Sequence, residues 1–436
     1  MDSDRTIMPM NDQSGQPAGF GDLIRTFLRI SLLGFGGPNA HIALMLDEVV
    51  DRKGWITRQH FMHLVAATNL LPGPNSSEVA IHIGYTQRGW RGAFATGLSF
   101  LLPTLIMVTV LSALYFSYGS LPSVEGIFWG LKPAVLAVIL AAGWKLGKTA
   151  LGFPENQEWH LFLLALGGIG VSFFYSGSEV PAMAAGGLLT WLLFKRTSGV
   201  GGPGTPPPPA PKGGQQSRLS TAALPFALPP AAAASGMTPV IGSGLTSALG
   251  ASGFLGVLGS LGSLPSLFLL TLGAGAVLFG GGYMLVALIE PFVVESAGWL
   301  TADQFLDGIA LTQAVPGPIV TLVAFVGYGV AGVPGAIVAT AGIYIPSFMA
   351  VLAVAPHLEK WRQAEGFRAA LKGVNAVVAG AILGVGFSLL PPAVPDPWAA
   401  GLFLLSLLAL LRFRVQALWV VGGGLLAGII HFVLIR

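Results

Sequence analysis

Long apolar runs dominate this chain and are separated by short polar segments. Nearly charge-free stretches cover residues 93–118, 333–355, 398–411 and 416–434. A helix of about 20 apolar residues matches the hydrocarbon thickness of a bilayer. The pattern therefore predicts an all-α polytopic membrane protein. Composition agrees, because 53% of the 436 residues are hydrophobic and 9% are charged, whereas about a quarter are charged in a soluble domain.

The apolar sequence falls into two halves. Residues 197–263 begin with TSGVGGPGTPPPPAPKGGQQ, a composition that does not pack into a core and predicts a linker. Residues 1–21 lack the basic-then-apolar pattern of a signal peptide and are expected to form a disordered tail. Residues 22–196 and 264–436 are then the two membrane domains.

The two halves are copies of each other. Residues 35–74 align with residues 279–318 without a gap, and sixteen of the forty aligned positions are identical. Both copies contain Pro-Gly-Pro, at 72–74 and at 316–318. This agreement exceeds what a shared apolar composition would produce, so the sequence indicates an internal duplication.

The basic residues indicate how the copies are oriented. Cytoplasmic loops of membrane proteins carry an excess of Lys and Arg. Loop 51–58 carries three basic residues and its counterpart, 295–302, carries none. Loop 119–125 carries none, and its counterpart carries three. Five loop pairs show this opposite bias, which predicts two inverted-topology repeats, as in many secondary transporters.

Inversion constrains the membrane crossings. Loops 51–58 and 87–91 are both basic and therefore both cytoplasmic, so residues 59–86 must enter and leave on the same side. Pro-Gly-Pro at 72–74 is then the tip of a re-entrant helical hairpin, since proline lacks a donor and glycine bends freely. About five crossings remain in each half. The first, at about 22–46, could instead be a short hairpin because its glycine-rich segment could break it.

Two hairpin tips that enter from opposite faces would meet near the membrane midplane. The helices that follow the tips expose unpaired N–H groups and the positive end of a helix dipole, which together favour an anion. The alternative is that the prolines merely kink helices and the serines bond backbone carbonyls. The candidate anion-binding residues are Pro72, Gly73, Pro74, Asn75, Ser76, Ser77, Pro316, Gly317, Pro318 and Thr321.

Glycine-rich segments GFGGP and FGGGY occupy corresponding places in the two copies. Gly36, Gly37, Gly280 and Gly281 are expected either to interrupt a second pair of helices beside the site or to let helices pack closely.

Three basic residues lie within or beside apolar segments. Arg25 and Arg29 are four residues apart on one helical face, and Lys132 lies inside an apolar run. Any of them could supply the fixed positive charge that a dianion needs. The alternatives are surface placement for the arginines and, for Lys132, a long side chain that reaches the interface.

Glu78 is a carboxylate deep in an apolar segment, where the second copy has Leu322 or Thr321. Ionisable groups at such depth usually face a cavity. A carboxyl group that is costly to ionise can load and release a proton, so Glu78, with His82 one turn away, is a candidate proton-coupling site. The alternative is a first-turn Glu that binds helix N–H groups.

The sequence lacks the residues and motifs that common enzymes and cofactor-binding proteins need. The chain has no cysteine, no P-loop, no dinucleotide fingerprint and no nucleophile–base trio. We therefore expect no enzyme, no cofactor and no metal site. A net charge of +3 is too small for a nucleic-acid footprint. His41, His60 and His63 lack metal-ligand geometry and are expected to be solvated or interfacial.

The segments FLRISLLGFGGPNAHIALM, DRKGWITRQHF and NLLPGPNSSEVAIHIGY, with the echoes FGGGYMLVALIE, GWLTADQF and ALTQAVPGPIV, resemble the chromate ion transporter family in its long, two-domain form. The resemblance covers both halves. It implies a multi-pass protein of the bacterial inner membrane that exports chromate, with sulfate as a competing tetrahedral dianion. We expect the linker to lie in the cytoplasm. The sequence leaves the oligomeric state undecided, with a homodimer as one possibility. One departure is Gly282, where the first copy has Pro38.

Export of a dianion agrees with simple energetics. A cell that is negative inside favours anion exit by about 2.3 kcal/mol per charge per 100 mV. Membrane potential could therefore drive export, and proton antiport would add to it. The alternative function is import or exchange of sulfate or another dianion.

Overall fold

The computed structural model describes residues 18–35, 37–68, 71–119, 121–152, 158–175, 177–198, 262–279, 281–354 and 365–435. Within these ranges the chain is helical and contains no strand. Five helical segments are long and apolar enough to cross a membrane: Asn75–Tyr118, Pro122–Ala150, Ile319–Ala353, Glu365–Ser388 and Ala417–Leu434. The prediction of an all-α, multi-pass membrane protein is therefore confirmed. The predicted tail and linker lie almost entirely outside the described residues.

The two halves share an order of elements, to which the second adds the short elements η4 and α16. The first has α1 (Phe20–Leu33), α2 (Pro38–Met45), the π-helical segment η2 (Leu46–Arg52), α3 (Arg58–Thr68), α4 (Asn75–Tyr118), α5 (Pro122–Ala150), α6 (Trp159–Phe174) and α7 (Glu179–Ser198). The second has α10 (Ser263–Ala276), α11 (Met284–Glu290), the π-helical segment η3 (Pro291–Ser296), α12 (Ala302–Ala314), the 3₁₀ turn η4 (Ile319–Thr321), α13 (Leu322–Val354), α15 (Glu365–Ser388), α16 (Leu390–Ala393), α17 (Pro397–Leu411) and α18 (Ala417–Ile435).

Helix α4 is folded back on itself. Its backbone leaves the helical conformation at Arg88 and Gly89, and the Thr96 hydroxyl donates to the Ala80 carbonyl at 2.7 Å. Sixteen residues of straight helix would separate these groups by about 24 Å. Residues 75–87 are therefore a first arm that lies antiparallel to a second arm, residues 90–118.

Helix α13 repeats this fold. Its backbone leaves the helical conformation at Ala331 and Gly332, and Gly332 has the same positive φ as Gly89, 61° against 58°. Gly327 and Gly335 pack directly against each other across the bend. The first arm is residues 322–330 and the second arm is residues 333–354.

The predicted crossing at 22–46 is interrupted. Helix α1 ends at Leu33 and α2 begins at Pro38. With 14 residues, α1 is about 21 Å long, shorter than the roughly 30 Å hydrocarbon core. The break that the sequence left open is therefore present, and residues 22–46 are not one continuous helix.

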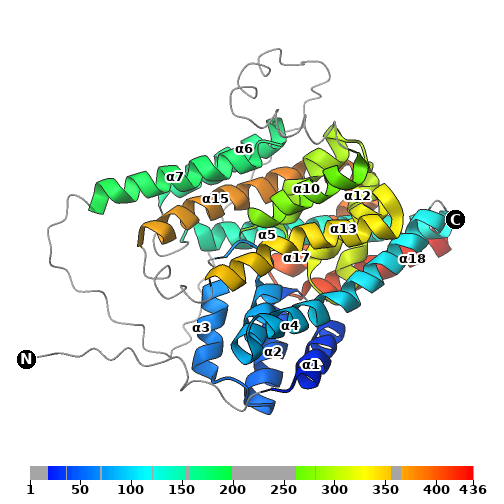
Figure 1. Ribbon diagram of the computed structural model, residues 1–436. Coiled ribbons are helices and arrows are strands. Elements are labelled where there is room, and N and C mark those ends of the chain that lie inside the picture. Colours follow the sequence, from blue (N-terminus) through cyan, green and yellow to red (C-terminus); the bar gives the residue numbers. More distant parts are fainter. Residues whose placement is uncertain are drawn as a thin grey trace, which may run out of the picture.

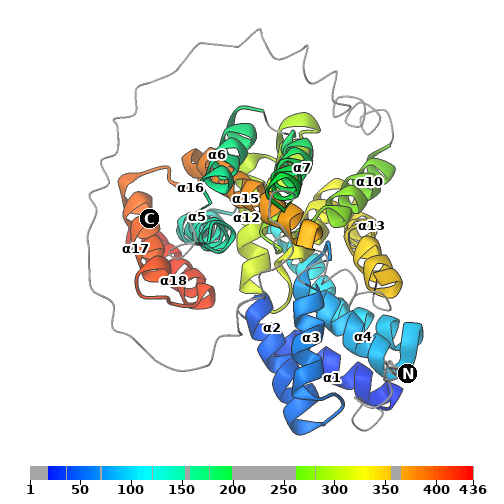
Figure 2. The ribbon, with the colours of Figure 1, turned by 90° about the vertical axis from the view of Figure 1, so that its left-hand side faces the viewer.

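Helices α5 and α15 occupy corresponding places in the two halves and run antiparallel. Gly147 lies beside Ala379 at one end of the pair, and Leu140 lies beside Gly386 farther along. Helices α6 and α7 of the first half pack along α15 of the second (Figure 1), and α17 and α18 pack on α5 (Figure 2). Each half therefore packs its last two long helices against the central helix of the other half.

Small residues allow these close helix contacts. Gly130 of α5 meets Gly424 of α18, and Gly186 of α7 meets Gly373 of α15, each at distances that leave no room for a side chain. Close backbone approach is the usual basis of helix association in lipid, where burial of apolar surface gives little gain.

The corresponding helices α3 and α12 have different neighbours. Helix α12 packs on α5, whereas α3 makes its main contacts with α4 and η2. Figure 2 shows α1, α2 and α3 gathered at one end of the molecule, while α12 lies beside α5.

Candidate anion-binding site

The two Pro-Gly-Pro segments are held by matching contacts with the opposite half. The Gly73 N–H donates to the Leu278 carbonyl at 2.8 Å, and the Gly317 N–H donates to the Gly34 carbonyl at 3.1 Å. Leu278 and Gly34 are themselves corresponding residues of the two copies. Each break therefore lies beside the glycine-rich segment of the other half.

Three polar side chains follow the first break and are sealed inside the protein. Ser76, Ser77 and Glu78 are at most 1% exposed. Neither hydroxyl nor either carboxyl oxygen of Glu78 has a hydrogen-bond partner among the described residues. No side chain caps the helix, which starts after Pro74. Within the described residues, the serines thus bond no backbone carbonyl and Glu78 binds no helix N–H group.

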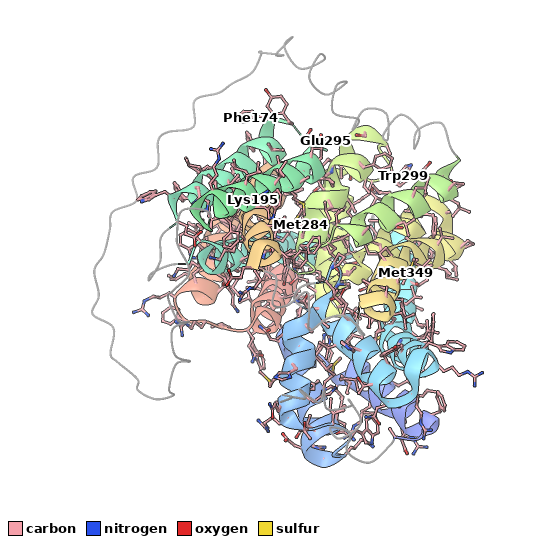
Figure 3. All side chains as sticks on the ribbon, turned by 60° about the vertical axis from the view of Figure 1, so that its left-hand side comes forward. Phe174, Lys195, Met284, Glu295, Trp299 and Met349 are labelled. Carbon is pink, nitrogen blue, oxygen red and sulfur yellow. The ribbon has the colours of Figure 1, made fainter. Side chains whose placement is uncertain are left out.

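Two residues that sequence analysis missed complete this cluster. Ser347 Oγ and Glu78 Oε1 both lie where a Cβ on Gly73 would be, so the two oxygens are close neighbours. The Tyr344 hydroxyl faces Ser77 without reaching full hydrogen-bond geometry. We call Ser76, Ser77, Glu78, Tyr344 and Ser347 the break cluster. Figure 3 shows Met349, two residues beyond Ser347, on the part of α13 that packs against α4.

Among the described residues, the second break has no matching cluster of unpartnered hydroxyls, although Gln313, three residues before Pro316, has a buried Nε2 without a partner. The Thr321 hydroxyl donates to the Pro318 carbonyl at 2.8 Å, and the Thr104 hydroxyl donates to the Pro316 carbonyl at 3.0 Å. In this conformation the predicted site residue Thr321 has no hydrogen left to donate to an anion. The breaks share a backbone but differ in available donors.

The glycine-rich segments contribute backbone bends. Gly37 precedes α2 with φ +81° and Gly281 has φ +109°, while Gly36 and Gly280 lie outside the described residues. The Gly34 carbonyl also accepts from His41 Nε2 at 2.9 Å. His41 is fully buried, so the prediction of a solvated or interfacial residue is wrong for it.

The two predicted arginines lie on the exposed side of α1. Helix α1 buries Leu23, Phe27 and Ile30 and leaves Arg25 and Arg29 on its opposite, exposed side. Arg29 forms only a long ion pair, 3.8 Å, with Glu48. Spacing of four residues placed the arginines on one face, but that face is the outer one.

Lys132 lies at one end of the α5–α15 pair. Its Nζ is 2.6 Å from Asp303 Oδ1 and 3.5 Å from Asp307 Oδ1, and Tyr115 donates to Asp307 at 2.7 Å. These residues line a cavity of about 580 Å³.

Lys372, the repeat partner of Lys132, lies at the other end of that helix pair. It is 2.8 Å from Glu158 and lines a cavity of about 370 Å³. Each lysine therefore lines a cavity at one end of the helix pair and is paired with a carboxylate.

His82 is buried one turn after Glu78 on the same arm, and its Nδ1 has no partner among the described residues. No group of three His, Cys, Asp or Glu side chains able to hold a metal occurs in the described ranges. The unsatisfied groups around the first break are hydroxyls, a carboxyl and an imidazole, which bind an anion or exchange a proton.

This combination of membrane-spanning helices, interrupted helices and buried donors defines a multi-pass membrane transport protein. A family model described as "Chromate transporter" matches the chain twice, over residues 21–191 and 265–429. The chain belongs to the chromate transporter family.

Curated relatives agree with this assignment. The chain is 31% identical over 415 residues to the chromate transport protein of Cupriavidus metallidurans, covering 95% of this chain and 94% of that protein. It is 32% identical over 374 residues to the chromate transport protein of Pseudomonas aeruginosa, covering 84% and 80%. A probable chromate transport protein of Synechococcus elongatus is 29% identical over 363 residues, covering 83% and 82%. No solved structure matches the chain.

Proposed function

We propose that this protein is a secondary transporter that exports chromate across the inner membrane by alternating access. Membrane potential drives the dianion outward, and proton antiport adds to it. The observation that carries this proposal is the break cluster, whose four hydroxyls and one carboxyl are buried without hydrogen-bond partners in the part of the chain that the structure describes. Buried polar groups without partners cost about 1–3 kcal/mol each, so their presence needs a functional reason.

Inverted repeats are part of the proposal. Residues 22–196 and 264–436 are the two units, and Pro-Gly-Pro is the tip of a re-entrant hairpin in each. The antiparallel course of α5 and α15 supports inversion, as does the opposite bias of basic residues. Helices α3 and the first arm of α4, of 11 and about 13 residues, are of half-membrane length.

Chromate binds at the first break. Tetrahedral oxyanions only accept hydrogen bonds, so they require donors and positive potential. The helix that begins at Asn75 supplies the positive end of its dipole, and Ser76 and Ser77 supply hydroxyl donors. Gly73 allows the close approach of both repeats at this point.

Glu78 is the proposed proton-coupling group. An ionised carboxylate without a cation or donor is very costly in an apolar interior, so Glu78 carries a proton in the sealed arrangement. Ionised Glu78 and a bound dianion repel each other, so release of one accompanies binding of the other. His82, one turn away, is the proposed relay.

The two repeats differ as alternating access requires. Leu306 of α12 is fully buried, whereas Met62, its counterpart in α3, is 54% exposed. Gln59 and His63 stand where α12 has Asp303 and Asp307. In our proposal the Lys132 ion pairs close the end of the pathway beside α12 in the present state. In the opposite state of the transport cycle, α3 packs into the bundle and α12 separates from it.

Sulfate import or exchange is the second candidate, because sulfate has the shape and charge of chromate. The deciding experiment is flux in proteoliposomes under separately imposed voltage and pH gradients. Chromate movement that follows both gradients supports the proposal. Absence of chromate flux under either gradient refutes it, and preferred sulfate movement in the inward direction would support the second candidate.

A further inference from the structure

We propose that Tyr344 and Ser347 donate hydrogen bonds to the transported oxyanion, so that both repeats grip it at the first break. This inference rests on the proposed function and adds two residues from the second repeat to the site. It also assigns the second break a structural role instead of a binding one.

Both hydroxyls are unusual among the buried hydroxyls of this chain. Ser347 is fully buried and Tyr344 is 3% exposed, and neither hydroxyl has a hydrogen-bond partner among the described residues. A buried Tyr hydroxyl usually finds a hydrogen-bond partner, and buried helical Ser and Thr hydroxyls often bond the carbonyl one turn back. Thr340, on the same arm of α13, does so with Ala336 at 2.8 Å. The two hydroxyls therefore have free donors for a reason that helix structure does not supply.

The two residues are three positions apart on one face of α13, and they lie beside the first break and the start of α4. Ser347 Oγ borders Gly73 next to Glu78 Oε1, and Tyr344 faces Ser77. The free donors of the two repeats thus converge on one place.

The corresponding residues of the first repeat do not supply the same hydroxyl donors to the second break. Thr104 corresponds to Ser347, but its hydroxyl donates to the Pro316 carbonyl. Leu101 corresponds to Tyr344 and has no donor. Apolar Ile319 and Val320 follow the second break, where the first has Asn75 and Ser76. Among the described residues, the hydroxyl donors are thus without partners at the first break and bonded or absent at the second, where the unpartnered donor is the amide Nε2 of Gln313, three residues before Pro316.

Four hydroxyl donors from two helices suit the four oxygens of a tetrahedral anion. Two of them belong to α4 and two to α13, so the full set exists only while these helices meet at the break. Anion affinity is thereby tied to the relative position of the repeats, and movement between them releases the anion.

The test is binding of radiolabelled chromate to the purified full-length protein, with thermal unfolding of the anion-free protein measured in parallel. We expect Tyr344→Phe and Ser347→Ala each to raise the chromate Kd roughly tenfold or more, as loss of a hydrogen bond to a charged ligand does. Because each change removes an unsatisfied buried hydroxyl, the anion-free variants should unfold at or above the wild-type temperature.

Thr340→Val is the matched control, since it removes a bonded hydroxyl from the same arm. Its Kd should stay within about twofold of wild type, because this hydroxyl bonds only its own helix. Wild-type affinity in both Tyr344→Phe and Ser347→Ala would overturn this inference alone. Wild-type protein that binds and transports no chromate would overturn the proposed function and this inference together.

Discussion

Gly73 and Gly317, at corresponding positions of the two repeats, each donate the backbone N–H to the opposite repeat. The acceptors are the carbonyls of Leu278 and Gly34, at 2.8 and 3.1 Å. Both glycines also have positive φ, 145° and 128°. The two Pro-Gly-Pro breaks are therefore held by equivalent backbone hydrogen bonds between the repeats. The side chains around the two breaks differ.

Gly73→Ala should abolish chromate transport. A non-glycine residue at this φ is strained by about 1–3 kcal/mol, and its Cβ would overlap Glu78 and Ser347. Gly89→Ala is the control, because Gly89 has φ +58° with open space around its Cβ position. It should cost about 1–2 kcal/mol of stability and keep transport. Chromate uptake into everted vesicles measures transport by the two variants. An active Gly73→Ala protein would contradict the assigned geometry.

Replacing Ser76 and Ser77 together by Ala should weaken chromate binding at least tenfold. Hydrogen bonds to a charged ligand contribute about 1.5–3 kcal/mol each, and neither hydroxyl has another partner among the described residues. Thr321→Val at the second break should leave affinity nearly unchanged, because this hydroxyl already bonds Pro318. Equilibrium binding decides, and equal affinity of the double variant and wild type would place the anion elsewhere.

Glu78→Gln should flatten the pH dependence of chromate transport in proteoliposomes. The amide cannot ionise, so it neither repels the dianion nor carries a proton. Chromate speciation is the same for both proteins, so the difference between their pH profiles reports Glu78.

Glu179→Gln provides the control for that experiment. Glu179 is 3% exposed but accepts a hydrogen bond from Ser172 in α6, away from the breaks. The pH profile of chromate transport by the Glu179→Gln variant should follow that of the wild type. A Glu78→Gln profile parallel to wild type would remove the proton role and leave anion binding intact.

Cysteines introduced at Lys132 and Asp303 and joined by a short, reducible bifunctional thiol reagent should block transport, and reduction should restore it. The Lys132 Nζ reaches Asp303 Oδ1 at 2.6 Å, so a spacer of side-chain length can join α5 to α12, and the alternating model requires these helices to separate. The natural chain has no cysteine, so background cross-links are absent.

Cysteines at Asp51 and Arg58 make the matching control for that cross-link. These residues form an exposed ion pair at 2.9 Å within the first repeat, and a bond between them joins no moving parts. Full transport by the cross-linked Lys132–Asp303 pair would show that α12 stays docked during the cycle.

Several features were predictable from the sequence because they repeat. Identical residues at a fixed spacing revealed the duplication, and Pro-Gly-Pro marked the ends of α3 and the start of α4. Glu78 stood out because a carboxylate in an apolar run is rare. Each of these signals is local, or it compares two segments of the same chain.

Tyr344 and Ser347 could not be found in this way. They lie in an apolar run in which no spacing or charge marks them, and their role depends on packing against a break some 270 residues earlier. Arg25 and Arg29 illustrate the opposite error. Their spacing defines a helix face but not whether that face is buried, which the neighbouring helices decide.

The most direct test of the central claim is a cryo-electron microscopy map of the protein in a lipid nanodisc with chromate. The account predicts density for one tetrahedral anion between Ser76, Ser77, Tyr344 and Ser347, at the depth of the bilayer centre, with the two repeats facing opposite sides. Both Pro-Gly-Pro segments at the water boundary, or two repeats that face the same side, would contradict it.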